Sequence, residues 1–276
     1  MTGEWEIERL DLEAYLHRIG CADDLAPTGE ALTRLHRAHI AAIPFENLDI
    51  VLGDGVAVDL DSVQAKLVGS GRGGYCYEHG VLFAAALERL GYTVDRLLAR
   101  IGGDQLRPRP RTHMALRVRR GDEEWLADVG FGAGLLEPLP WGDTGAHRQG
   151  GWTYQLSPTD DGAWQVRERH GQDWSVLYNV TPQPQHASDV VMANHFTATH
   201  PDSPFAGQLV VMSKHDDVRR RLLGRQLSTT RPDGTTEQRQ LTDAELAAAL
   251  RDEFGVPLTR PQVAALTASL RSEIAP

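Results

Sequence analysis

Residues 69–91 read GSGRGGYCYEHGVLFAAALERLG and join a glycine-rich loop directly to a strongly helical segment. From Cys76 onward the apolar residues Val81, Leu82, Ala85 and Leu90 recur at helical spacing. Gly91 follows where a helix commonly ends in a residue of positive φ. The pattern predicts a helix that begins at Cys76, with the unpaired backbone N–H groups of its first turn beside the thiol.

The position of Cys76 at a helix start indicates a reactive cysteine. The helix dipole and the free N–H groups favour a thiolate and a lowered thiol pKa, and the Cys76 N–H is placed to bind an oxyanion. Gly73 and Gly74 are expected to leave room for a substrate beside the backbone. The competing interpretations are an ordinary buried cysteine, a phosphate-binding loop, which lacks its Gly-Lys-Ser/Thr ending, and a metal site of Cys76, Glu78 and His79, which lacks a second cluster of ligands.

Composition excludes several broad classes of protein. The chain has 276 residues, 41% of them hydrophobic, and a formal net charge of -10, so it can bury a large core and offers no basic face for nucleic acid. The basic run from Arg107 to Arg120 fits a solvated loop and strand edge, or a site that attracts a phosphorylated ligand. The acidic start lacks signal-peptide character, no apolar run spans a membrane, and two cysteines, Cys21 and Cys76, suit a reducing cytoplasm.

The order of periodic segments predicts an α+β fold. Helices are expected at 12–19, 29–42 and 76–90, and short alternating strands follow in the middle third as a meander or small barrel. The last segment combines a strand at 207–214 with a helix at 242–255, which Thr242 and Glu245 start as a capping box. The expected strands of the middle third are residues 93–101, 112–120, 123–131, 152–157, 163–170 and 175–180.

A hairpin is predicted to bring a histidine and a carboxylate together. THMALRVRR and EEWLADVGF flank Gly121 and Asp122, and any loop of even length puts His113 and Asp128 on the same face. A two-residue loop makes them diagonal neighbours, whereas a four-residue loop makes the contact less direct. A histidine oriented by a carboxylate and facing a thiol is an arrangement for nucleophilic catalysis, but spacing alone does not select His113 among eleven histidines.

Five segments together resemble one known family. RGGYCYEHG around Cys76 is similar to the arylamine N-acetyltransferase signature Arg-Gly-Gly-x-Cys-x-Glu-x-Asn. The segments IPFENLDI, THMALRV, ADVGFG and ANHFTATHPDSPF occur in the family's order, and the resemblance extends from Leu12 to about Phe205. It implies that Cys76 is the acetyl-accepting nucleophile, His113 the base and Asp128 the residue that orients it.

The resemblance also implies a fold and its division. The expected core is like that of cysteine proteases and transglutaminases. A helical domain at 1–92 carries the nucleophile, a β-barrel-like domain at 93–200 carries His and Asp, and an α/β lid follows at 201–276. Gly80 stands where the signature has Asn, which puts local helix stability and the hydrogen bonds that support the catalytic residues in question.

Further residues take roles from the resemblance alone. Arg72 is expected to pair with Glu46 near Asp49 as structural support. The remaining positions are expected to contact the aromatic acceptor or coenzyme A: Phe45, Gly130, Phe131, Gly132 and Phe205.

The implied reaction is acetyl transfer from acetyl-coenzyme A to arylamines, arylhydrazines or N-hydroxyarylamines, by a ping-pong path through an acetyl-cysteine. Acetyl-coenzyme A is then a co-substrate, with no permanently bound cofactor and no metal. The alternatives are an amide synthase of the same family that closes a macrolactam from a carrier-bound acyl chain, a thiol amidase or peptidase, and a binding module that kept the fold.

Overall fold

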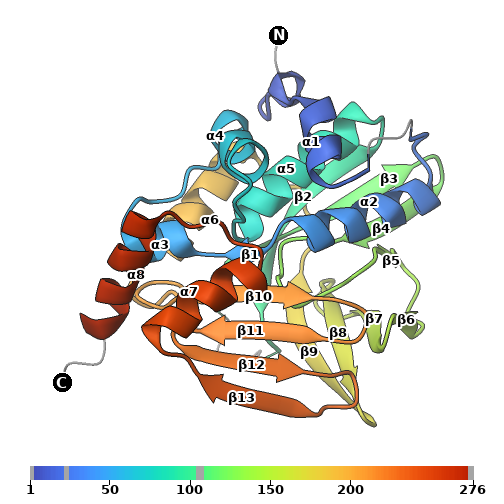
Figure 1. The fold of residues 1–276 in the computed structure, drawn as a ribbon. Helices are drawn as coiled ribbons and strands as arrows, with labels where there is room; N and C mark the ends of the chain where they lie inside the picture. The colour runs from blue at the N-terminus through green and yellow to red at the C-terminus, as the bar shows by residue number, and fades with distance from the viewer. Residues whose placement is uncertain (1–2, 22–24, 104–108, 273–276) are drawn as a thin grey trace.

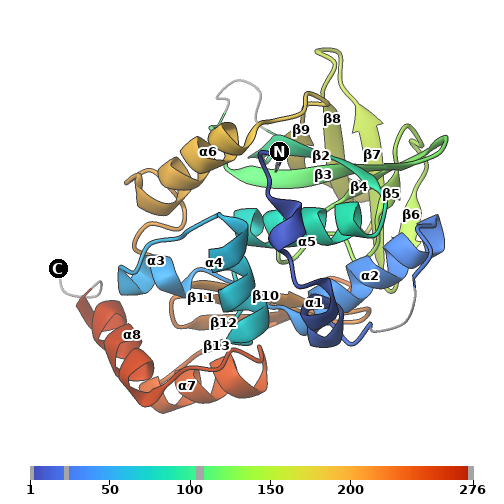
Figure 2. The same cartoon turned by 90° about the horizontal axis from the view of Figure 1, so that it is seen from above.

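A computed structural model describes residues 3–21, 25–103 and 109–272 and shows a helical part packed on two sheets (Figures 1 and 2). A 3-10 turn, η1, and a π-helical turn, η2, accompany the helices of the first third of the chain. These elements are η1 (Ile7–Arg9), α1 (Leu12–Arg18), α2 (Gly29–Ala42), α3 (Leu48–Leu52), α4 (Leu60–Gln64), η2 (Ala65–Gly69) and α5 (Cys76–Arg89).

The middle of the chain forms an antiparallel sheet of eight strands in the order β5-β4-β3-β2-β9-β8-β7-β6, curved like a barrel. Its inner face buries an apolar cluster that includes Leu97, Leu126, Tyr154 and Val166. The strands are β2 (Thr93–Ile101), β3 (His113–Arg120), β4 (Glu123–Ala127), β5 (Leu139–Pro140), β6 (His147–Gln149), β7 (Trp152–Pro158), β8 (Trp164–His170) and β9 (Asp173–Val180).

The last part of the chain forms a second antiparallel sheet, in the order β1-β10-β11-β12-β13. Its first strand comes from far upstream, because Phe45 of β1 pairs with Met212 of β10. Two terminal helices pack against it in a separate apolar cluster (Figure 1). The new elements are β1 (Phe45–Glu46), α6 (Ala187–Thr199), β10 (Val210–Lys214), β11 (Arg219–Leu223), β12 (Gln226–Thr230), β13 (Thr236–Gln240), α7 (Asp243–Asp252) and α8 (Arg260–Ser272).

Helix α5 occupies the centre of the molecule. Every residue from Cys76 to Leu87 is buried, and the helix packs against β2 and β3 on one side and against α1 and α4 on another (Figure 2). It begins at Cys76, as the sequence predicts, and Gly91 follows it with a φ of 95°. The helix therefore fixes the thiol at the junction of the helical part and the barrel-like sheet.

The hairpin between β3 and β4 has the shorter of the two loops considered above. Arg120 pairs with Glu123, so only Gly121 and Asp122 form the turn. The numbers of each pair of opposed residues therefore add up to an odd value along the ladder, as a loop of even length requires. The predicted strand at 123–131 is too long, because pairing ends at Ala127. The backbone N–H of Asp128 instead donates to the side chain of His36.

Several elements lacked a clear sequence signal. The strands β11, β12 and β13 carry mostly polar or exposed residues, and α3 and α4 are only five residues long.

The division into domains at 92 and 200 stays a prediction. The apolar clusters cross it, since Leu48 packs with the terminal helices, whereas Val190 of α6 packs with α5.

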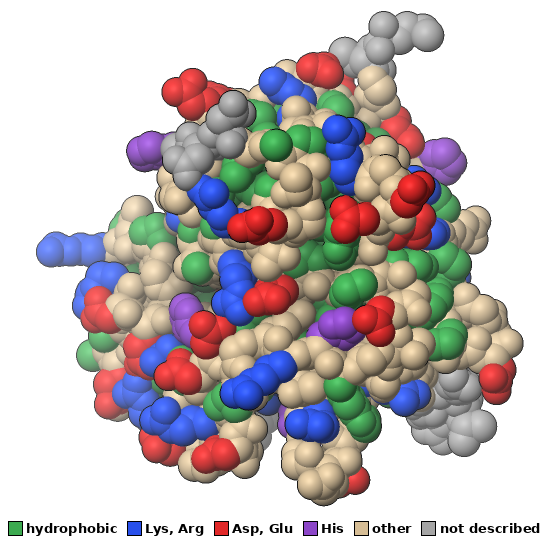
Figure 3. All heavy atoms as spheres, turned by 90° about the vertical axis from the view of Figure 1, so that its right-hand side faces the viewer, with side chains coloured by type: hydrophobic (Ala, Val, Ile, Leu, Met, Phe, Trp, Pro, Cys, Tyr) green, Lys and Arg blue, Asp and Glu red, His purple; other side chains and the backbone are tan. Residues whose placement is uncertain are grey.

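The surface carries charges of both signs. On the face drawn in Figure 3, Lys and Arg side chains alternate with Asp and Glu rather than gathering into one basic region. Arg107 and Pro108 of the basic run lie outside the described part, but Arg117 pairs with Glu124 and Arg119 with Asp95. Among the described residues no helix is both long and apolar enough to span a membrane.

A buried ion cluster connects the two sheets. Lys214 of β10 is 2% exposed and donates to Glu168 of β8 at 2.6 Å and to the carbonyl of Ala133 at 3.0 Å. Arg219 of β11 donates to the other oxygen of Glu168 at 2.9 Å. Burial lowers the pKa of Lys214 to about 8, and the contact with Glu168 limits that decrease.

We predict that Lys214→Met lowers the free energy of unfolding by about 3 kcal/mol, because it removes one partner of a buried charge while Arg219 remains. Arg251→Met, which breaks an exposed pair with Asp252, should leave it nearly unchanged. Urea denaturation of both variants measures the difference. Equal effects would show that the buried cluster does not stabilise the contact between the sheets.

Candidate active site

The structure brings Cys76, His113 and Asp128 to one place. Nε2 of His113 lies 2.8 Å from Oδ2 of Asp128, and the two residues are 2% and 3% exposed. Cys76 and His113 both line a cavity of about 860 Å³. Because Asp128 accepts the Nε2–H of a neutral imidazole, Nδ1 of His113 is the ring nitrogen available to take a proton.

Asp128 is held as an anion in a buried place. Its Oδ1 accepts from the N–H of Gly130 at 3.0 Å. Burial raises its pKa, but His113, the hydroxyl of Tyr178 and the Gly130 N–H outweigh this effect, so the pKa lies below its ordinary value. The Tyr178 hydroxyl lowers the pKa of Asp128 without forming a hydrogen bond of ordinary geometry to any described residue. The negative charge of Asp128 is therefore available to stabilise an imidazolium at His113.

The surroundings of the Cys76 thiol correct the expectation of a lowered pKa. Burial raises its pKa strongly, the charge of Asp128 raises it further, and the backbone N–H groups of Met114 and Tyr77 lower it only in part. The thiol donates to the carbonyl of Thr112 at 3.6 Å. Desolvation thus outweighs the helix start, and the resting sulfur needs a base to remove its proton.

Aromatic side chains form the walls of the cavity. The rings of Phe45 and Phe205 lie 6.0 Å apart between centroids, and the Phe131 ring meets that of His113 edge-on at 5.3 Å. All three phenylalanines line the cavity, together with Phe196, which the sequence analysis did not select. The predicted aromatic residues therefore line the same cavity as the thiol, in an arrangement that suits a flat apolar ligand.

Glycines allow close backbone approach at the loop after Asp128. A Cβ on Gly130 would lie 2.8 Å from the carbonyl oxygen of Cys76, and one on Gly132 would lie 2.7 Å from the Phe45 ring. Gly73, in contrast, makes room for the protein and not for a substrate, because its Cβ would lie 2.1 Å from the carbonyl oxygen of Pro44. The expectation of substrate space at Gly73 and Gly74 is wrong, since neither residue lines the cavity.

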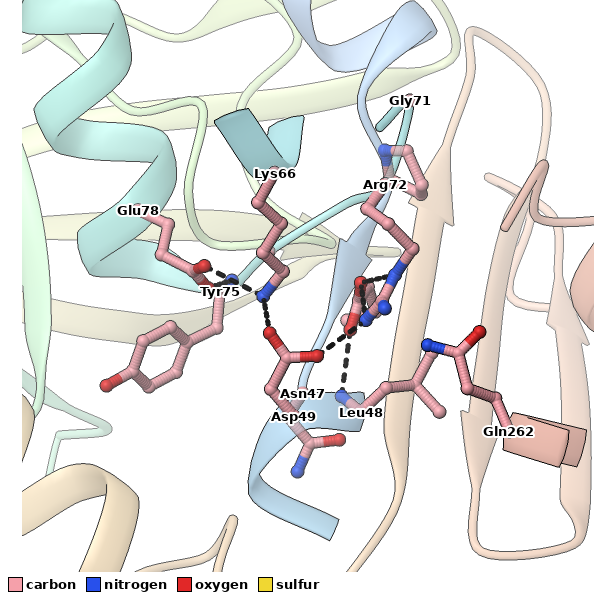
Figure 4. A network of polar contacts seen from close by, with 12 residues as sticks. Asn47, Leu48, Asp49, Lys66, Gly71, Arg72, Tyr75, Glu78 and Gln262 are labelled. Carbon is pink, nitrogen blue, oxygen red and sulfur yellow. Dashed lines mark hydrogen bonds and ion pairs between the residues drawn. The ribbon is translucent and has the colours of Figure 1, made fainter. Parts of the chain in front are cut away.

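A network of charges supports the loop before Cys76 (Figure 4). Arg72 donates to Glu46 and to Asp49 at 2.9 Å each, so the predicted pairing is present. Lys66 lies between Asp49 and Glu78, at 2.6 and 2.8 Å. Glu78 accepts from the Tyr75 N–H at 3.0 Å, and its burial raises its pKa to about 7. These contacts fix the N-terminus of α5.

A chain of buried histidines, which no sequence motif indicated, lies beneath this loop. Tyr15 contacts Nδ1 of His39 at 2.9 Å, Nε2 of His39 contacts Nδ1 of His79 at 2.9 Å, and Nε2 of His79 lies 3.1 Å from the carbonyl oxygen of Gly74. Burial lowers the pKa of both histidines, so the chain is neutral. The spacing of His36 and His39 on one face of the second predicted helix was the available signal.

The departure at Gly80 has a physical reason. A Cβ at this position would lie 3.0 Å from both Sδ and Cε of Met114, whose side chain is buried. Met114 thus fills space that a larger residue at position 80 would need.

In the described residues no group of three His, Cys, Asp or Glu side chains is arranged to hold a metal ion.

Comparison with known proteins agrees with this geometry. The family model described as N-acetyltransferase matches residues 28–263. An arylamine N-acetyltransferase / N-hydroxyarylamine O-acetyltransferase of Salmonella typhimurium is 39% identical over 206 residues, which are 74% of this chain and 73% of that protein. A proansamycin X synthase of Amycolatopsis mediterranei is 34% identical over 184 residues, 65% of this chain and 70% of that protein.

Solved structures share the whole fold. The arylamine N-acetyltransferase of Mycobacterium abscessus has a TM-score of 0.92 and 38% identity, with 97% of both chains covered. That of Mycobacterium marinum in complex with CoA has a TM-score of 0.85 and 33% identity, covering 95% of this chain and 99% of that one. The expected cysteine-protease-like core with a barrel-like sheet is thus confirmed. The chain belongs to the arylamine N-acetyltransferase family.

Proposed function

We propose that this enzyme transfers an acetyl group from acetyl-coenzyme A to arylamines, arylhydrazines or N-hydroxyarylamines. The observation that carries the proposal is the placement of Cys76 and His113 on one aromatic-lined cavity of about 860 Å³, with Asp128 hydrogen-bonded to His113. The name of the Salmonella relative includes acetyl transfer to arylamines and to N-hydroxyarylamines, and the Mycobacterium marinum relative binds CoA. Acetyl-coenzyme A is then a co-substrate, and the chemistry calls for no resident cofactor.

The first half-reaction acylates the enzyme. Nδ1 of His113 takes the proton of the Cys76 thiol, and the sulfur attacks the acetyl carbonyl carbon of acetyl-coenzyme A. The oxyanion that forms accepts from the Cys76 N–H at the start of α5. When the tetrahedral intermediate collapses, the bond to the coenzyme A sulfur breaks, and that sulfur takes the proton from His113. An acetyl-cysteine remains.

The second half-reaction transfers the acetyl group to the amine. The amine nitrogen attacks the thioester carbonyl, His113 accepts the proton that the nitrogen loses, and the Cys76 sulfur leaves and regains a proton. An aryl ring is positioned by Phe45, Phe131 or Phe205, beside the loop of Gly130 and Gly132. These walls limit the access of water, so hydrolysis of the thioester is slow relative to aminolysis.

The second candidate is an amide synthase that closes a macrolactam from a carrier-bound acyl chain. The similarity to proansamycin X synthase supports it, but over a smaller share of the chain than the acetyltransferase relatives. A thiol amidase or peptidase has no comparable support, and a binding module does not need the ordered Cys, His and Asp.

The cellular setting and the division of the chain are further parts of the proposal. Both cysteines are free, and the proposed chemistry requires a reduced thiol, which supports a cytoplasmic location. We assign the nucleophile to the unit 1–92, the base and its carboxylate to 93–200 and the lid to 201–276. Small-molecule substrates are the partners proposed here, and the oligomeric state is left open.

Steady-state kinetics test the reaction class. With acetyl-coenzyme A and an arylhydrazine varied together, the account predicts parallel double-reciprocal lines, because coenzyme A leaves before the amine enters. Cys76→Ala should abolish turnover, while Cys21→Ala, at the other buried cysteine, should retain it. Intersecting lines, or cleavage of simple amides in place of acetyl transfer, would contradict the proposal.

Alkylation tests the nucleophile separately. We expect iodoacetamide to label Cys76 before Cys21, because Cys76 lines the cavity and has His113 to accept its proton. Peptide mapping after a short exposure near neutral pH identifies the labelled residue. Faster labelling of Cys21 would remove Cys76 from its proposed role.

The variant Asp128→Asn tests the orienting carboxylate. The amide neither favours the required tautomer of His113 nor stabilises its imidazolium, so turnover should fall by about 100-fold or more. Asp122→Asn, in the turn of the same hairpin, is the matched control and should keep wild-type activity. Circular dichroism establishes that each variant is folded. If both variants are folded and turn over at comparable rates, Asp128 does not orient His113.

A further inference from the structure

The side chain of His36 contacts the backbone of Asp128. It lies in α2 and is completely buried, with an exposure of 0%. Its Nε2 lies 3.1 Å from the backbone nitrogen of Asp128, and its Nδ1 lies 3.0 Å from the carbonyl oxygen of Leu136. A side chain of the helical part therefore holds both ends of the loop that follows β4.

The two contacts define one protonation state of the ring. A backbone N–H only donates and a carbonyl only accepts, so Nε2 of His36 accepts from Asp128 and Nδ1–H donates to Leu136. Burial lowers the pKa of His36 to about 4, although the charge of Asp128 and the contact with the Leu136 carbonyl favour the proton. The ring is neutral at physiological pH, with a fixed tautomer and both nitrogens paired.

Among the described strands, none offers the Asp128 N–H a partner that could replace this contact. Pairing between β3 and β4 ends at Leu116 and Ala127, one residue earlier. The Asp128 carboxylate then bends back to the Gly130 N–H on one oxygen and to His113 on the other. The position of the carboxylate therefore depends on where the Asp128 peptide is held.

Neighbouring contacts make His36 a rigid support. Its ring meets Phe83 of α5 edge-on, with centroids 5.8 Å apart. The next residue, Arg37, donates to Glu137 at 2.7 Å, beside Leu136. Helix α2 is thus fixed to the loop on both sides of the His36 ring.

We propose that His36 is a positioning residue of the acyl transfer, which sets the Asp128 carboxylate, and through it the His113 ring, by accepting the Asp128 N–H. This inference rests on the proposed function, and it assigns to His36 no contact with substrate. A residue with this role affects the acylation of Cys76 and leaves the affinity for the amine nearly unchanged.

Three substitutions separate this role from simple packing. His36→Gln keeps an oxygen near the place of Nε2, where it accepts the Asp128 N–H, but loses the donor to Leu136. His36→Asn keeps a donor for Leu136 and loses the acceptor. His36→Met matches the shape of Gln and has only a weak acceptor, so it serves in place of Asn if that variant does not fold.

The experiment measures the single-turnover rate of Cys76 acetylation by acetyl-coenzyme A, kcat and KM, and thermal unfolding, for each full-length variant. We expect His36→Asn and His36→Met to acetylate about 10–100-fold more slowly, as follows from an unpaired buried donor, with little change in the KM of the amine. His36→Gln should stay within about threefold of the wild type. Equal rates for Gln and Met, or rates that follow only the unfolding temperature, would overturn the proposal.

A parallel measurement keeps this test independent of the proposed reaction. Alkylation of Cys76 by iodoacetamide also depends on proton removal by His113 but uses no acetyl-coenzyme A. The same order, Gln faster than Asn and Met, is expected. If the wild type is not acetylated, the proposed function fails, while the order of the alkylation rates still decides the role of His36.

Discussion

The hydrogen bond between His113 and Asp128 is the contact on which the rest of the site depends. A carboxylate that is 3% exposed has lost most of its hydration, and its charge persists only because protein groups replace the water. His113 occupies one oxygen at 2.8 Å, and the Gly130 N–H occupies the other. The short hairpin, the glycine loop and the packing of α2 all serve to place this buried pair beside the thiol.

The thiol itself illustrates a balance of opposing effects. The start of α5 offers backbone N–H groups to the sulfur, which stabilise a thiolate, but burial and the nearby charge of Asp128 raise the pKa of Cys76. In the proposed mechanism, His113 rather than the helix therefore removes the proton.

Local patterns in the sequence predicted the parts of the fold that they determine. The bounds of α2 and α5 follow from apolar spacing and terminal signals, and the parity of the hairpin predicted that His113 and Asp128 share a face. Contacts between distant segments left no such pattern. His36 lies 92 residues from Asp128, and the pairing of β1 with β10 joins segments far apart in the chain. The thiol pKa was also wrongly expected to be lowered, because burial is a property of the whole fold.

The most direct measurement of the central claim is the mass of the intact enzyme after mixing with acetyl-coenzyme A alone. The proposed mechanism predicts one equivalent of coenzyme A released in a burst, one acetyl group added at Cys76, and its loss when an arylhydrazine is added. An enzyme that gains no acetyl group at Cys76, yet still turns over with both substrates present, would contradict it.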